Sequence, residues 1–155
     1  MINFRFLILV MLVLLASCSY GDKTVDIAAD DPEMLAAFSK AKETLPTFWG
    51  IYEKPNNGES DFALKVKIED ENGVEYFWVI NIDKKDGQIF GEINNNPEIV
   101  ESVKDGEVIE VIPDHITDWQ YIKNEKIVGN FTMRVLLKHM PEDEAKEYRD
   151  MLAEP

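Results

Sequence analysis

The stretch Asp61–Ile82, DFALKVKIEDENGVEYFWVINI, determines the fold class. Apolar residues occupy every second position of its first half, which is the pattern of a half-buried strand: Phe62, Leu64, Val66 and Ile68. Asn72-Gly73 then predicts a hairpin turn. The second half, Val74–Ile82, carries apolar residues on both faces, which predicts a central strand that a helix covers on one side.

The strand pattern continues after this hairpin. Asp86-Gly87 predicts a turn into a third strand at Gln88–Asn94, and Val108–Ile112 predicts a fourth. A last hairpin is expected from Ile116–Ile122 and Lys126–Gly129. The expected fold class is α+β, with a mostly antiparallel, curled sheet of about five to six strands, an N-terminal helix and C-terminal helices. The pattern leaves the strand order open.

The helices are predicted from their start signals and their periodicity. Asp31-Pro32-Glu33 predicts the start of a helix whose apolar face recurs every three or four residues up to Leu45. Pro46 is expected to end or bend this helix, and Thr47–Glu53 to form a further helical turn. A short helix is expected at Pro97–Lys104, where a proline and an acid again follow a capping residue.

Two segments near the C-terminus also have helical character. Thr132–Met140 fits both a strand and a helix, and we favour the helix. Pro141–Leu152 is rich in strong helix formers and opens with proline and acids, which predicts a helix.

The first residues have the pattern of a bacterial secretion signal. Arg5 precedes the apolar run Phe6–Leu15, which is too short to span a membrane, because a spanning helix needs about 20 residues. The quartet Leu15-Ala16-Ser17-Cys18 resembles a lipobox. This resemblance implies cleavage before Cys18, a lipid on its sulfur and acylation of the new amino group, and two or more chains would anchor the protein stably. The alternative is an ordinary signal peptide with an incidental cysteine.

The expected organisation follows from this leader. Residues 1–17 are a signal peptide that is removed, residues 18–30 are the lipidated cysteine and a tether, and residues 31–155 are one domain. We expect the protein in the bacterial cell envelope, anchored to a membrane and facing the periplasm. Ser19 after the cysteine favours the outer membrane in a Gram-negative host.

The charge of the chain excludes one class of partner. Without residues 1–17 the chain has 15 Lys and Arg against 30 Asp and Glu, a net charge of −15. Nucleic-acid binding needs a basic surface, so we expect none, whereas a basic protein partner is compatible with this charge. Cys18 is the single cysteine, so a disulfide within the chain is excluded.

One cluster of residues is a candidate ligand-binding site: Asp118, Trp119, Thr132 and Arg134, joined by Asp61 and Lys65. Arg134 is either a clamp for a ligand carboxylate or the partner of Asp118 in a structural ion pair, and we favour the structural pair. The three tryptophans, Trp49, Trp78 and Trp119, either line a groove for sugar or peptide or pack in the core, and we favour packing.

Catalytic motifs are scarce in the sequence. The serines after Cys18 lie in no G-x-S-x-G turn, and the chain has no phosphate-binding glycine loop. Asp114, His115 and Asp118 place metal-ligand and acid–base side chains within five residues. A structural zinc site takes about four protein ligands, so a solvated turn is the favoured interpretation. We therefore predict no catalytic residue, no metal and no cofactor.

The chain also resembles a known family over Ala41–Leu152. The segments that carry the resemblance are AKETLPTFW, SDFALKV, VEYFWV, NNNPE and DHITDWQYIKNEKIVGNFTMRVLLKHM. The most specific part is Asp118-Trp119 followed by Gly129, Thr132 and Arg134. These segments are similar to the YegJ-like family of bacterial proteins, whose common domain is of unknown function. The resemblance implies an α+β domain and transfers no catalytic residue.

Three hypotheses for the function follow. The leading one is an acyl-anchored envelope lipoprotein, held to the membrane at Cys18, whose domain binds a ligand or partner without catalysis. The first alternative is an immunity or inhibitor protein that neutralises a basic toxin or hydrolase. The second is an enzyme that uses Asp114, His115 and Asp118. The oligomeric state stays open.

Overall fold

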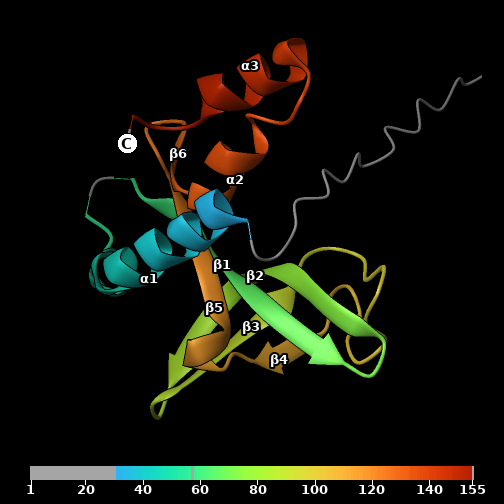
Figure 1. Ribbon diagram of the computed structural model, residues 1–155. Helices are drawn as coiled ribbons and strands as arrows, with labels where there is room; N and C mark the ends of the chain where they lie inside the picture. The colour runs from blue at the N-terminus through green and yellow to red at the C-terminus, as the bar shows by residue number, and fades with distance from the viewer. Residues whose placement is uncertain (1–30, 57, 155) are drawn as a thin grey trace, which may run out of the picture.

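A six-stranded antiparallel sheet is the centre of the fold, and the computed structural model describes it within residues 31–56 and 58–154 (Figure 1). The strands lie in the order β4-β3-β2-β1-β5-β6. Their bounds are β1 Ser60–Asp70, β2 Gly73–Lys85, β3 Gln88–Ile93, β4 Val108–Glu110, β5 Ile116–Lys123 and β6 Lys126–Gly129. The α+β class and the two hairpins are confirmed. The predicted leader and tether, residues 1–30, lie outside the described residues.

The helix α1, Pro32–Glu53, lies across the sheet (Figure 1). The side chain of Asp31 caps it by accepting hydrogen bonds from the backbone N–H groups of Glu33 and Met34, at 2.8 and 3.0 Å. Buried residues of α1 recur along one face, including Ala41 and Phe48. Among the described residues no helix has the length and apolar character that crossing a membrane requires.

Of the two outcomes expected at Pro46, an end of the helix is wrong, because α1 continues through this residue, and the helical turn expected at Thr47–Glu53 is confirmed as the last part of α1. Proline removes one helical hydrogen bond and costs about 3 kcal/mol in a helix interior. Because proline has no N–H, the carbonyl of Lys42 lacks its helical hydrogen bond. Lys42 and Pro46 both lie on the exposed side of the helix, where water can bond to this carbonyl. The turns on either side bury Ala41 and Phe48 in the same core, and this packing outweighs the local cost.

The core lies between α1 and one face of the sheet. Phe48, Leu64 and Phe77 have no exposed surface, and the same cluster includes Trp119 of β5. The ring of Phe48 lies 5.5 Å from that of Trp119 and 5.8 Å from that of Phe62. Within β2, the face with fewer apolar residues, that of Phe77 and Val79, is the fully buried one.

Two short helices and the chain end complete the fold at the β6 edge. α2 spans Phe131–Leu136 and α3 spans Glu142–Met151. The helix favoured for Thr132–Met140 is therefore confirmed, although it ends at Leu136. Leu152 forms a parallel bridge with Ile127 of β6, and the N–H of Ala153 donates to the carbonyl of Ile127 at 2.8 Å. Figure 1 shows α2 and α3 together beyond the N-terminal half of α1.

The predicted helix at Pro97–Lys104 is wrong, since this segment forms only bends. Its backbone N–H groups bind carboxylates of the first hairpin instead. Glu75 accepts hydrogen bonds from the N–H groups of residues 98, 99 and 100 at 3.0–3.2 Å, and Asp70 accepts from those of residues 101 and 102 at 2.7 and 3.0 Å. Five successive donors are thereby satisfied outside a helix.

Candidate functional site

The predicted site is only partly assembled around Asp118. Asp118 lies in β5 with no exposed surface, and its carboxylate accepts hydrogen bonds from the backbone N–H groups of Phe131 and Thr132 at 3.2 and 2.8 Å. It also accepts from the Thr132 hydroxyl at 2.7 Å and from the N–H of Trp119 at 2.8 Å. Asn130, the residue before α2, has a left-handed φ of 49° and no side-chain cap, so Asp118 caps this helix from another strand.

Lys65 completes this buried cluster from the neighbouring strand. It pairs with Asp118 in the β1–β5 register, and its Nζ donates to the Thr132 hydroxyl at 3.2 Å. The same Nζ lies 5.4 Å from the centroid of the Trp78 ring. The result is a chain of contacts from Lys65 through Thr132 to Asp118, which links β1, α2 and β5.

The pKa values of Asp118 and Lys65 shift in opposite directions because both side chains are buried. Burial raises the pKa of Asp118, against the opposing effect of the hydrogen bonds from Thr132, Trp119 and Phe131. Burial lowers the pKa of Lys65, against the opposing effect of the Asp118 charge. Both shifts show that burial disfavours the charged form of each side chain, and Thr132, which is hydrogen-bonded to both, joins them inside the fold as a structural latch.

The other predicted members lie elsewhere. Trp119 turns to the opposite face of β5, where its indole N–H donates to the Ala41 carbonyl at 3.0 Å. Asp61 is exposed at the start of β1, with a φ of 52° and a hydrogen bond from the Ser60 hydroxyl at 2.7 Å. The expected ion pair between Arg134 and Asp118 is wrong: Arg134 donates to the Ala153 carbonyl at 2.9 Å.

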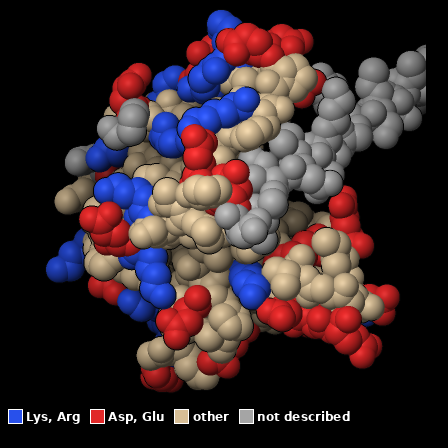
Figure 2. Space-filling model, viewed as in Figure 1, with Lys and Arg blue, Asp and Glu red and all other residues tan. Residues whose placement is uncertain are grey.

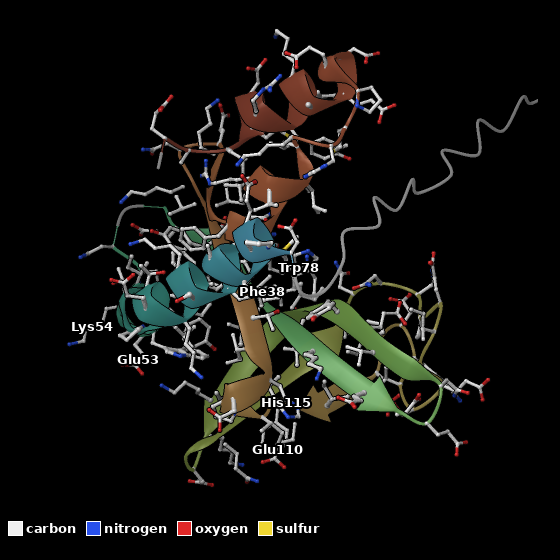
Figure 3. The ribbon with its side chains drawn as sticks, in the orientation of Figure 1. Phe38, Glu53, Lys54, Trp78, Glu110 and His115 are labelled. Atoms are coloured by element: carbon white, nitrogen blue, oxygen red, sulfur yellow. The ribbon has the colours of Figure 1, made fainter. Side chains whose placement is uncertain are left out.

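The side chains of the proposed enzyme do not converge. Asp114 lies in the 3₁₀ turn Pro113–His115 with 91% of its side chain exposed, and it pairs with Lys42 at 3.8 Å. Asp118 is fully buried under α2, as described above. Figure 3 shows His115 at the lower end of the sheet, in the region of Glu110. Within residues 31–56 and 58–154, no three His, Cys, Asp or Glu side chains gather as a metal site requires.

The tryptophans likewise do not line one groove. Trp119 is in the core with 4% of its surface exposed. Trp49 packs at the edge of that core, where the Nζ of Lys84 lies 4.7 Å from its ring centroid. Trp78 is on the other face of the sheet, near Lys65.

The most distinctive surface is strongly acidic, and no motif or residue spacing in the sequence predicted it. We call residues 69–75 and 92–112 the acidic lobe, because they hold ten Asp and Glu and a single basic residue, Lys104. Figure 2 shows the resulting field of acidic side chains around the sheet hairpin and the segment beside it. The acids are Glu69, Asp70, Glu71, Glu75, Glu92, Glu98, Glu101, Asp105, Glu107 and Glu110.

Two of these acids have a structural role within the lobe. Glu75 and Asp70 bind the backbone of residues 98–102, so they fix the segment that presents Glu98 and Glu101. Burial alone would raise the pKa of Asp70, but the hydrogen bonds from the N–H groups of Asn72, Glu101 and Ser102 together lower it. Glu98 and Glu101 therefore sit on a segment whose backbone is held by hydrogen bonds.

Exposed apolar residues lie among these acids. Ile99, Val108 and Ile112 are 49, 65 and 46% exposed, and they are three of the six large exposed hydrophobic residues in the described part of the chain. Val108 belongs to β4, the three-residue edge strand of the sheet. Apolar residues within a rim of one charge are typical of a protein-binding surface.

Comparisons with known proteins give a family without an activity. Residues 31–153 match the model of a family described as "Uncharacterized protein conserved in bacteria (DUF2314)". "Uncharacterized protein YegJ" of Escherichia coli (strain K12) is 33% identical over 150 residues, which cover 94% of this chain and 97% of that protein. "Putative ankyrin repeat protein NMB1133/NMB1171" of Neisseria meningitidis serogroup B (strain ATCC BAA-335 / MC58) is 31% identical over 129 residues, which cover 77% of this chain and 50% of that protein.

No solved structure gives a significant match. The family match covers nearly all described residues, from the cap of α1 to the bridge beside β6, and the identity to the E. coli protein extends over almost the whole of both chains. These findings agree with the resemblance carried by the tryptophan strand and the Asp118 segment. The chain therefore belongs to the DUF2314, or YegJ-like, family of uncharacterized bacterial proteins.

Proposed function

We propose that this protein is an acyl-anchored lipoprotein of the bacterial envelope whose domain binds a basic protein partner without catalysis. The anchor is Cys18, at the end of a leader with the pattern of a lipoprotein signal. The membrane holds the lipid, and the domain faces the periplasm. The binding surface is the acidic lobe.

The single observation that carries the proposal is the combination of charge and apolar exposure in this lobe. The acids attract a cationic partner over a distance of about 8 Å at physiological salt, which increases the rate of encounter. Ile99 and Val108 then supply apolar area that water leaves when the partner docks. The carboxylates of Asp70 and Glu75 fix the backbone of this surface before binding, so less conformational entropy is lost.

A narrower form of the proposal names the partner as a basic toxin or hydrolase that binding neutralises. The same surface supports it, because an inhibitor needs only to cover a cationic site with a complementary acidic one. It makes one additional demand: the captured partner must be an enzyme or toxin whose activity falls when this protein is added. The enzyme hypothesis based on Asp114, His115 and Asp118 is set aside, since those side chains diverge.

The anchor is tested first, by growing cells with an alkyne analogue of palmitate and measuring its incorporation. We expect label in the wild-type protein, none in Cys18→Ala, and release of the variant from the membrane fraction. Labelling that persists in Cys18→Ala, or membrane association that does not depend on this residue, would contradict the anchor.

The lobe is tested by crosslinking in intact cells with two matched variants. One replaces the exposed acids Glu98, Glu101 and Asp105 by Gln, Gln and Asn. The other makes the same change of charge outside the lobe, at the exposed Glu125, Asp143 and Glu147. We expect a basic protein to crosslink to the wild type and the second variant, and to be lost from the first.

The purified pair then gives a quantitative check. Neutralising the lobe should lower the association rate and reduce its dependence on salt, because the rim charges act mainly during encounter. Equal losses in both variants would show that net charge alone matters, and the lobe would not be the binding surface.

A further inference from the structure

A cationic cleft lies at the opposite edge of the sheet from the acidic lobe. It is formed by α2, α3 and the C-terminal segment, and its volume is about 380 Å³. Its floor is apolar, from Leu137, Leu152 and Ala153. Its walls carry Arg134, Lys138 and Arg149, with Glu154 as the single acid. Three cations around one cleft stand out in a chain with a net charge of −14.

The cations are held in ways that leave them available to a ligand. Lys138 pairs with Glu33 at 2.7 Å and Arg149 with Glu142 at 2.5 Å, and the side chains of both pairs are about half exposed or more. Exposed ion pairs of this kind contribute little to stability, so they exchange partners readily. These pairs hold Lys138 and Arg149 at the cleft and leave their positive charges free to bind a ligand.

Arg134 is the least satisfied of the three. Its Nη2 donates to the Ala153 carbonyl at 2.9 Å, which directs the guanidinium to the cleft wall. Its Nε is the one buried side-chain nitrogen or oxygen in the described part of the chain that has no hydrogen-bond partner. A buried donor without an acceptor is costly, and native proteins rarely keep one without a reason.

We propose that this cleft binds a small organic carboxylate whose apolar body rests on Leu137 and Leu152. Guanidinium groups bind carboxylates through two parallel hydrogen bonds, and two residues with such groups, Arg134 and Arg149, line the cleft. The volume lies within the ordinary range of small-molecule sites, about 300–1,000 Å³. Glu154 and the apolar floor favour a single negative charge over a dianion such as phosphate. Binding of a carboxylate at this cleft requires neither the acidic lobe nor the lipid anchor.

The arginine content of the chain makes a direct test simple. The sequence contains three arginines, Arg5, Arg134 and Arg149, and two of them line the cleft. In the full chain isolated from its host and labelled with ¹⁵N only at arginine, hexanoate is titrated at constant ionic strength while the Nε–H signals are recorded. The matched probes are hexanamide, which lacks the charge, and inorganic phosphate, which lacks the apolar body.

We expect the Arg134 and Arg149 signals to shift saturably with hexanoate, with a midpoint at least about tenfold lower than for either other probe. Arg149→Gln should raise the midpoint, whereas Lys146→Gln, which removes another exposed positive charge of α3 that lies outside the cleft, should leave it unchanged. Arg149 is used because Arg134 also holds the chain end.

The proposal is overturned by any of three outcomes. The first is the absence of a saturable shift with hexanoate. The second is an equal midpoint for two of the probes. If hexanamide equals hexanoate, the carboxylate is not recognised, and if phosphate equals hexanoate, the apolar body is not recognised. The third is an equal effect of the two charge variants, which would assign the effect to net charge.

Discussion

Replacing Thr132 with valine removes one hydroxyl from the buried cluster while keeping the shape of the side chain. Thr132 is 1% exposed, and its hydroxyl donates to Asp118 at 2.7 Å and accepts from Lys65 at 3.2 Å. A hydrogen bond to a charged group contributes about 1.5–3 kcal/mol, and a buried group left without its partner costs about 1–3 kcal/mol. Asp118 keeps three backbone donors, so we expect a loss of about 3 kcal/mol in the free energy of unfolding.

The assay is urea unfolding followed by tryptophan fluorescence, since Trp119 is next to Asp118 in the chain. With a slope of about 2 kcal/mol per molar urea, the midpoint of Thr132→Val should fall by about 1.5 M. The control is Thr132→Ser, which keeps the hydroxyl and loses one methyl group, at a cost of about 1 kcal/mol. If valine were tolerated as well as serine, the latch through Thr132 would be refuted.

Four further substitutions test the backbone geometry and the pKa shifts. Gly129→Ala should abolish stable folding in thermal melts, because φ is +86° there and a Cβ would lie 2.4 Å from the Trp119 carbonyl oxygen; Gly50→Ala on the exposed side of α1 should raise the free energy of unfolding by about 0.5–1 kcal/mol. Asp70 has a lowered pKa in the folded state, so its contribution to stability is present above its unfolded pKa of about 4 and lost below it. Asp70→Asn should therefore lower the free energy of unfolding at pH 7 and make it depend less on pH in the acid range. An unchanged acid dependence would contradict the role of Asp70 in holding residues 101 and 102. Lys65 also has a lowered pKa in the folded state, but it is a base, so stability falls as pH falls through this pKa and Lys65 becomes charged. Wild-type stability should thus gain from Lys65 on going to alkaline pH, and Lys65→Met should lack this gain in urea midpoints measured across that range.

Local patterns predicted the sheet well because its signals are short-range. The hairpin of Asp61–Ile82 and the later one around residues 124 and 125 both follow from alternation and turn residues. The strand order depended on which distant strands pair, and β1 joins β5 across more than 40 residues of sequence. No local pattern contains that information.

The two wrong helix predictions have the same cause. Pro46 fails to end α1, and the segment after Pro97 fails to form a helix, because partners distant in sequence decide each case. The core holds Ala41 and Phe48 on both sides of Pro46, whereas Glu75 takes the N–H groups that would have started a helix. Proline signals describe the local cost, and tertiary contacts can exceed it.

The candidate site was predicted in part for a related reason. Asp118, Thr132 and Lys65 meet, but Arg134 faces the chain end, which sequence spacing had no means to place. Lys138 lies four residues after Arg134, so a shared face was detectable from spacing. Arg149 joins them only through the packing of α3.

The bridge between Ile127 and Leu152 protects one edge of the sheet from pairing with a second copy of the chain. A sheet with a free edge can add a strand from a second molecule, and many such additions become a fibre. Here the chain end occupies the β6 side with Leu152 and Ala153, while the other side ends in a strand of only three residues. A protein truncated after Met151 would expose backbone donors and acceptors of β6. Copies of this shortened protein would then pair with one another through that edge.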